Sequence, residues 1–193
     1  MLTYFRELLS MESFDIAVSF VLAKEGGLNE NPKDKGGITN KGISLRFLKS
    51  LSAGELRSYG IFVGYEASED DIRNLTEEQA INIYKGVFWD NAPFGKIKNQ
   101  SNLNYIFDMS INMGINPAIK CAQRACWAVM RQKDIIKDDG ILGNKTLSML
   151  NHCGIYLLSA MRSERAGYYK LIAEKDETQH TFLEGWLNRA YGG

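Results

Sequence analysis

The sequence is poor in the residues from which metal and redox centres are built. Its 193 residues include three cysteines, an odd number with no CxxC pair, which argues against a disulfide framework and against a zinc cluster. Cys121 and Cys126 lie in an apolar stretch with helical spacing, so we expect buried free thiols. The two histidines, His152 and His180, are far apart. We therefore expect no metal and no cofactor.

Excess charge and long apolar runs are also missing. Lys and Arg together number 23, as do Asp and Glu, which removes the electrostatic argument for a nucleic-acid or anionic-membrane partner. No stretch approaches the roughly 20 apolar residues of a membrane span. The N-terminus lacks a basic start followed by an apolar segment, so it does not resemble a signal peptide. We expect a monomer made in the cytoplasm, or one whose export signal lies outside this sequence.

Helical periodicity dominates what is present. Apolar residues from Phe14 to Leu22 recur at helical spacing, Ser13 is a possible N-cap, and Gly26 and Gly27 would end this helix after Glu25. The following stretch to residue 44 is rich in glycine and predicts a folded loop, with a possible small β-hairpin at 34–44.

Further helices are indicated along the rest of the chain. One is expected to start near Ser44, and Thr76 followed by Gln79 predicts a capping box for a helix over 77–88. In the second half we expect helices over 103–113, 155–175 and 179–190. We expect another helix to begin after an N-cap at Asn116, with Pro117 at its first position. The segment 52–75 gives no clear pattern. The fold class is therefore all-α, or mainly α.

The loop after Glu25 contains the residues most suited to catalysis. A carboxyl at the negative end of a helix, partly buried, is disfavoured in its ionised form, as a general acid near neutral pH requires. Glycines leave space beside it, and the loop adds the carboxylate Asp34 and the hydroxyl Thr39, which could hold a water. Glycoside hydrolysis needs these two functions. Glu30 is a rival second carboxylate that looks solvent-facing. The same pattern also fits a surface Glu before an ordinary turn.

The spacing of this loop resembles the N-terminal signature of glycoside hydrolase family 108. The matching positions are Glu25-Gly26-Gly27, Asn31-Pro32, Asp34, Gly36-Gly37, Thr39-Asn40 and Gly42-Ile43-Ser44, and Leu28 departs from the family's frequent aromatic. Later positions resemble the same family and its C-terminal peptidoglycan-binding region: Ile83-Tyr84, Phe88-Trp89, Phe107-Asp108, Asn112, Gly114, Gln123, Asp139-Gly140, Gly143, Thr146 and Gly185–Arg189.

This resemblance implies a lysozyme-like fold and an N-acetylmuramidase that cleaves the β-1,4 bond between N-acetylmuramic acid and N-acetylglucosamine. It implies that Glu25 is the catalytic acid, with Asp34 and Thr39 positioning water. We expect a lead at 1–13, a lysozyme-like catalytic region at 14–98, and a helical peptidoglycan-binding region at 99–193 packed in the same globule. The partner would be peptidoglycan glycan strands, and the site of action the periplasm or cell wall.

Four further residues are candidate sugar contacts. Asp108 and Asn112 are four apart and share a helix face, so they could line the cleft; the alternative is a hydrogen-bonding pair on the helix surface. Trp89 and Tyr105 could stack on sugar rings, with core packing as the alternative.

Two rival functions remain at this point. A lytic transglycosylase also uses one Glu but needs no water-positioning carboxylate, so Asp34 argues against it. A non-catalytic wall-binding or secretion-assisting protein would keep the fold without cutting, and the presence of Glu25 argues against that.

Overall fold

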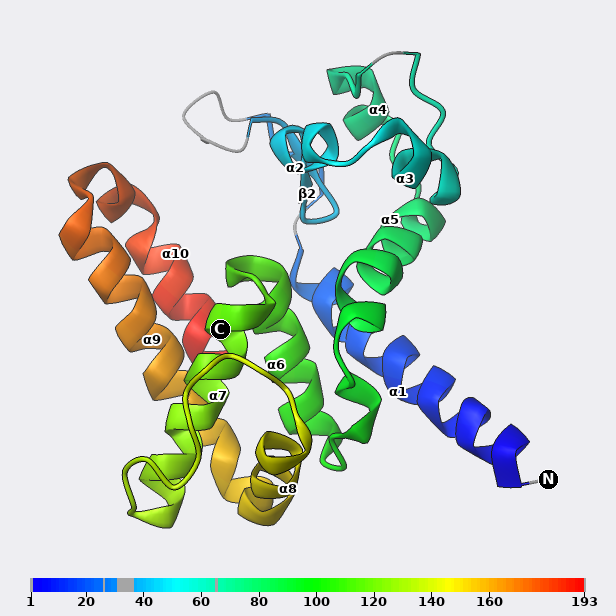
Figure 1. The fold of residues 1–193 in the computed structure, drawn as a ribbon. Helices are drawn as coiled ribbons and strands as arrows, with labels where there is room; N and C mark the ends of the chain where they lie inside the picture. The colour runs from blue at the N-terminus through cyan, green and yellow to red at the C-terminus, as the bar shows by residue number, and fades with distance from the viewer. Residues whose placement is uncertain (1, 26, 31–36, 65, 193) are drawn as a thin grey trace. The chain divides into compact units, whose positions relative to one another are not determined.

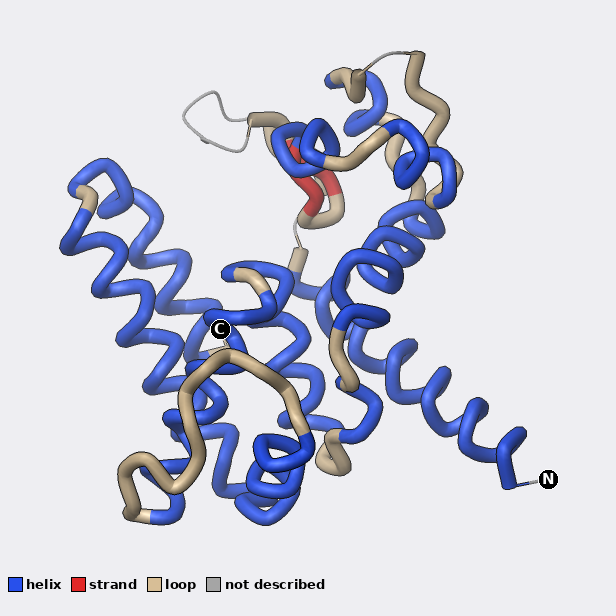
Figure 2. Tube along the Cα trace, in the orientation of Figure 1, coloured by secondary structure: helices blue, strands red, loops and turns tan. Residues whose placement is uncertain are grey.

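The computed structural model describes residues 2–25, 27–30, 37–64 and 66–192. These residues are mainly helical and contain one two-stranded antiparallel sheet (Figure 2), which confirms the mainly α fold class. The chain divides into two compact units, residues 1–91 and 92–193.

The first unit begins with the long helix α1, Leu2–Lys24, shown in blue in Figure 1. The predicted N-cap at Ser13 is wrong, because the helix runs through this position. Residues 2–12 are rich in good helix formers such as Leu and Glu, so they extend the helix upstream. The predicted apolar face is buried at Phe14, Ala17, Val18 and Val21.

A hairpin and short helices complete this unit. They are β1 (Thr39–Asn40), β2 (Ile43–Ser44), α2 (Leu45–Ser50), α3 (Ala53–Ser58), α4 (Glu69–Arg73), α5 (Glu77–Ile83), the π-helix η1 (Tyr84–Phe88) and the 3₁₀ turn η2 (Trp89–Asn91). The predicted hairpin is confirmed, and so is the start of α2 after Ser44, whose hydroxyl accepts from the Phe47 N–H at 3.1 Å.

The capping box at Thr76 and Gln79 is also confirmed at the start of α5. The predicted helix over 77–88 is helical throughout, but its last five residues form a π-helix. The stretch over 52–75 contains α3 and α4. Each begins with a capping box, Ser52 with Glu55 and Ser68 with Asp71.

The second unit is a bundle of longer helices. It contains η3 (Phe94–Lys96), α6 (Gln100–Met113), α7 (Ile115–Met130), α8 (Asn144–Cys153), η4 (Gly154–Tyr156), α9 (Leu157–Lys175), η5 (Glu177–Gln179) and α10 (His180–Tyr191). Helix α9 packs against α7 and runs beside α10, as Figure 1 shows in orange and red. The helices predicted over 103–113, 155–175 and 179–190 are confirmed as α6, α9 and α10, with small shifts at their ends.

The predicted cap at Asn116 is wrong. Gly114, with φ of +88°, separates α6 from α7, so α7 starts at Ile115 and Asn116 lies in its first turn. The Asn116 amide instead donates to the Asp139 carbonyl at 3.1 Å. The Asn116 side chain, which the local pattern predicted to cap the helix, therefore makes a tertiary hydrogen bond instead.

The buried centre of this unit holds Leu103, Ile106 and Phe107 from α6 with Ala122 from α7. Cys121 and Cys126 are buried free thiols, as expected, and Cys153 is a third. Burial raises the pKa of Cys121 to about 11, so this thiol stays protonated near neutral pH.

Candidate active site

Glu25 follows directly on the last residue of α1. Its backbone N–H still bonds to the helix, with the Val21 carbonyl at 3.1 Å and the Leu22 carbonyl at 3.2 Å. Val21 is fully buried, so the helix end is anchored in the core while the Glu25 side chain stays half-buried. A rigid helix therefore fixes the direction in which this carboxyl leaves the backbone.

The hairpin after it turns at Lys41 and Gly42. Asn40 pairs with Ile43, and the two residues between them have φ values of +51° and +74°. Positive φ at both central residues defines a type I′ turn, the form that matches the twist of a two-residue hairpin. On its outer side Thr39 exchanges backbone hydrogen bonds with Asn29, at 2.7 and 2.9 Å.

The turn lies against the Glu25 carboxyl. A Cβ atom placed on Gly42 would be 2.5 Å from Cδ of Glu25, 2.7 Å from its Oε2 and 2.6 Å from the Tyr84 hydroxyl oxygen. The side chains of Glu25, just after α1, and of Tyr84, the first residue of η1, thus both lie against Gly42. Only glycine fits there, because both the positive φ and the contact exclude a side chain.

Tyr84 holds the turn through a hydrogen bond. Its ring is buried, and its hydroxyl donates to the Lys41 carbonyl at 2.7 Å. It is the first residue of the π-helix, a form of backbone often found at functional sites. Tyr84 was not among the predicted site residues. The available signal was a tyrosine on a buried helix face, because a buried phenol needs a hydrogen-bond partner.

Asn40 is a second residue that sequence reasoning missed. It is buried, and its amide donates to the Ile72 carbonyl at 2.9 Å and the Arg73 carbonyl at 3.4 Å. The hairpin is thereby tied to the end of α4. Arg73 also binds Glu30 at 2.9 Å, and Glu30 is exposed, as predicted for this rival carboxylate.

Thr39 and Asp34 are the two residues expected to position water opposite Glu25. Thr39 is half-buried on the strand that leads into the Gly42 turn, and its hydroxyl donates to the Gly37 carbonyl at 3.3 Å. It precedes Asn40, whose pair with Ile43 closes the turn. Asp34 lies outside the described residues.

The candidate sugar contacts are distributed over both units. Trp89 is half-buried in the first unit and packs on Phe14, with ring centroids 5.1 Å apart at 60°. Asn112 is exposed at the end of α6 in the second unit. Tyr105 is buried, and its hydroxyl donates to the Ala190 carbonyl at 2.5 Å.

Asp108 is completely buried between two arginines. Its carboxylate accepts from Arg165 and Arg189, both at 2.6 Å. Burial opposes its ionisation, but attraction by the two guanidinium groups outweighs burial and lowers its pKa. Neither Asp108 nor Tyr105 reaches the surface, so we do not propose either as a sugar contact. Both join α6 to the last two helices.

A hydrogen-bond network around the buried Gln123 holds the bend at Asp139-Gly140. The Gly140 N–H donates to Gln123 Oε1 at 2.9 Å, and Gln123 Nε2 donates to Asp139 at 2.9 Å and to Thr146 at 3.0 Å. These matched positions therefore shape the second unit.

Within the described ranges no group of three or more His, Cys, Asp or Glu side chains could hold a metal ion. No helix among them is long and apolar enough to cross a membrane.

A mainly α protein with a helix-end glutamate held against a glycine turn has the features of a lysozyme-like glycoside hydrolase. The family model described as Glycosyl hydrolase 108 matches residues 9–114, and the one described as Predicted Peptidoglycan domain matches residues 117–191. The chain belongs to glycosyl hydrolase family 108. It is therefore a glycoside hydrolase, its partner is peptidoglycan, and it acts at the cell wall.

The structure of SagA from Brucella abortus has a similar fold. It is 23% identical, with a TM-score of 0.62, over 94% of this chain and 95% of that one. Among curated proteins no match is found.

Proposed function

We propose that this protein hydrolyses the β-1,4 bond between N-acetylmuramic acid and N-acetylglucosamine in peptidoglycan, with Glu25 as the general acid. The observation that carries the proposal is that the Glu25 carboxyl and the Tyr84 hydroxyl both lie against Gly42 of the hairpin turn. In a family 108 glycoside hydrolase, a fixed carboxyl with a side-chain-free backbone beside it suits proton transfer to a bound sugar oxygen.

The reaction needs one proton donor and one water. The protonated Glu25 gives its proton to the glycosidic oxygen while the bond from that oxygen to the anomeric carbon breaks. A water then bonds to the anomeric carbon, and Asp34 takes its proton while Thr39 orients it. We propose these two roles from the spacing of the residues in the loop and from the position of Thr39 on the hairpin.

We also propose a division of labour along the chain. Residues 14–98 would catalyse the hydrolysis, and residues 99–193 would bind peptidoglycan. The two family matches support this order of functions along the chain, since the hydrolase family matches residues 9–114 and the peptidoglycan domain matches residues 117–191.

The test is clearing of a cell-wall suspension by the wild type and by Glu25→Gln. General acid catalysis contributes about 10²- to 10⁴-fold, so we expect a loss of that size without a change in thermal unfolding. Glu30→Gln is the matched control, because Glu30 is an exposed carboxylate of the same region held by Arg73. Full clearing by Glu25→Gln would refute the assignment.

Mass spectrometry of the digest separates the two bond-breaking reactions. Hydrolysis adds one water across the broken bond, whereas a transglycosylase leaves an anhydro sugar that is lighter by that water. Anhydro products would refute hydrolysis even if Glu25 proved essential.

A further inference from the structure

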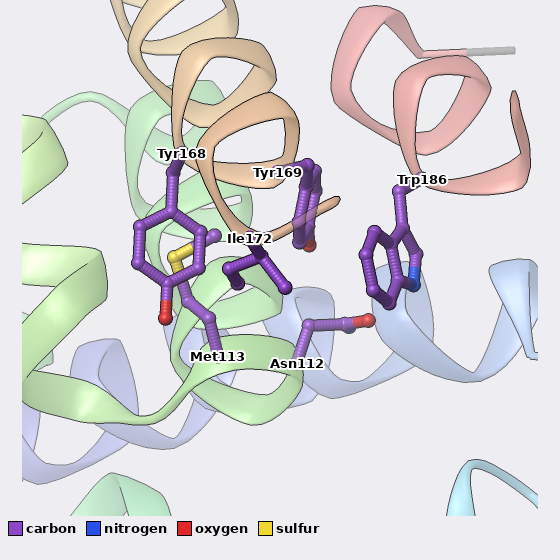
Figure 3. Close-up of a pocket in the computed structure, with 6 residues that line it drawn as sticks. All are labelled: Asn112, Met113, Tyr168, Tyr169, Ile172 and Trp186. Carbon is purple, nitrogen blue, oxygen red and sulfur yellow. The ribbon is translucent and has the colours of Figure 1, made fainter. Parts of the chain in front are cut away.

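The second unit contains a cavity that the proposed reaction does not use. It has a volume of about 260 Å³ and lies between the end of α6 and helices α9 and α10 (Figure 3). At about 30 Å³ for each liquid water it would hold roughly nine waters, which is the scale of one sugar ring. Its lining residues are Asn112, Met113, Tyr168, Tyr169, Ile172 and Trp186.

The aromatic wall of this cavity is fixed before any ligand arrives. The Trp186 ring stacks on Tyr169, with centroids 5.2 Å apart at 26°, and on Phe182, at 5.9 Å and 27°. Tyr169 is buried, and its hydroxyl accepts from Arg165 Nε at 3.1 Å. Rigid aromatic side chains lose little conformational freedom on binding.

Three polar atoms at the cavity have no hydrogen-bond partner among the described residues: Oδ1 of Asn112, Nε1 of Trp186 and the Tyr168 hydroxyl. The Asn112 amide is oriented because its Nδ2 donates to the Asp108 carbonyl at 3.2 Å. Its oxygen then points toward Trp186 (Figure 3). The Asn112 acceptor and the Trp186 indole donor thus lie on the same side of the cavity (Figure 3).

This pair matches the chemistry of an acetamido group. An acetamido N–H can donate to Asn112, and its carbonyl oxygen can accept from Trp186 Nε1. Met113 and Ile172 supply apolar surface for the methyl group and the carbon face of the ring. The lining residues carry no charge. A neutral sugar therefore fits better than the charged groups of a stem peptide or the carboxylate of muramic acid, whose burial without a counter-charge is costly.

We propose that this cavity binds an N-acetylglucosamine residue of the glycan strand, away from the bond that is cut. The proposal rests on the proposed substrate, a peptidoglycan glycan, but not on the role of Glu25. Such a site would let the helical second unit bind peptidoglycan through a defined sugar residue.

The test follows the indole N–H of Trp186 by NMR in the full chain. The three tryptophans give three indole signals, and Trp186→Phe identifies the one that matters. We expect N-acetylglucosamine to shift this signal in a saturable way, and glucose at equal concentration, which lacks the acetamido group, to leave it in place. An equal response to both sugars, or no response, would overturn the proposal.

Asn112→Ala tests the acceptor with little risk to folding, since this side chain is exposed. Losing one neutral hydrogen bond should weaken binding of N-acetylglucosamine by up to about tenfold. Asn188→Ala is the matched control, an exposed asparagine on α10 that does not line the cavity. Equal affinity in the two variants would overturn the proposal.

Binding to intact cell walls separates this site from catalysis. With Glu25→Gln as the common background, pelleting with insoluble peptidoglycan should fall on adding Asn112→Ala and stay unchanged on adding Asn188→Ala. Activity remaining in Glu25→Gln would refute the role of Glu25 as the acid without affecting the proposal that the cavity binds N-acetylglucosamine. A Trp186 signal that N-acetylglucosamine does not shift would refute the proposed sugar site without affecting the proposed hydrolysis.

Discussion

Replacing Gly42 by alanine should disable the enzyme far more than it destabilises the fold. An alanine methyl at this position would lie 2.5 Å from Cδ of Glu25 and 2.6 Å from the Tyr84 hydroxyl. Carbon atoms pack best at about 3.5 Å or more, so the carboxyl or the turn must move by about 1 Å. Tyr84 resists this movement because its ring is buried and its hydroxyl is bound to the Lys41 carbonyl.

The expected sizes of the two effects differ. A left-handed φ costs a non-glycine residue about 1–2 kcal/mol, which corresponds to roughly 2–8 °C in the melting temperature of a chain this long. Misplacing a catalytic group by about 1 Å can cost about 10²-fold in rate. We therefore expect Gly42→Ala to melt a few degrees lower and to clear cell walls about a hundredfold more slowly.

Gly37→Ala is the matched control. Gly37 has almost the same φ, +75°, but no described atom lies within 4 Å of an added Cβ. The backbone strain is thus shared by both variants, and the contact with Glu25 is specific to Gly42. If the two variants cleared cell walls at similar rates, the reasoning that places Gly42 against the catalytic carboxyl would be refuted.

Three further changes probe the two units. Asp108→Asn should destabilise the protein by about 3–5 kcal/mol in urea unfolding, because it leaves the buried Arg165 and the partly buried Arg189 without their carboxylate. Because the pKa of Asp108 is lowered in the folded protein, its ionisation stabilises the fold above about pH 4. This stabilisation is lost as the pH falls through the lowered pKa. The free energy of unfolding of the variant should therefore fall less steeply in acid than that of the wild type. Asn40→Ala should cost about 1–3 kcal/mol, since it leaves the end of α4 without a donor, and an unchanged unfolding midpoint would contradict that role. Gly140→Ala should lower the melting temperature more than Gly154→Ala. Both have positive φ, but only at Gly140 would the new Cβ meet Asn116; equal melting would count against the argument.

The sequence predicted the elements that depend on neighbouring residues. Apolar spacing located the helix that leads to Glu25, and the Thr76–Gln79 capping box located the start of α5. The same box pattern occurs at Ser52–Glu55 and Ser68–Asp71, so α3 and α4 could have been found in the stretch that gave no clear pattern.

Local sequence patterns do not predict contacts between residues that are distant in the chain. Tyr84 and the Lys41 carbonyl are 43 residues apart, and no local pattern joins them. Asp108 and Asn112 share a helix face, as predicted, yet one is buried between arginines and the other is exposed. Spacing indicates which side chains lie together on a helix, whereas packing against other helices decides which of them water or a ligand can reach.

The ion cluster around Asp108 has a consequence for how the chain can be divided. The hydrolase model ends at residue 114 and therefore includes α6, but α6 packs within the second unit. A fragment cut at the boundary between the two family models would carry Arg165 and Arg189 without the carboxylate that both of them bind. The inherited sequence modules and the folding units are thus offset by one helix, and a wall-binding fragment that is to fold alone should begin before α6.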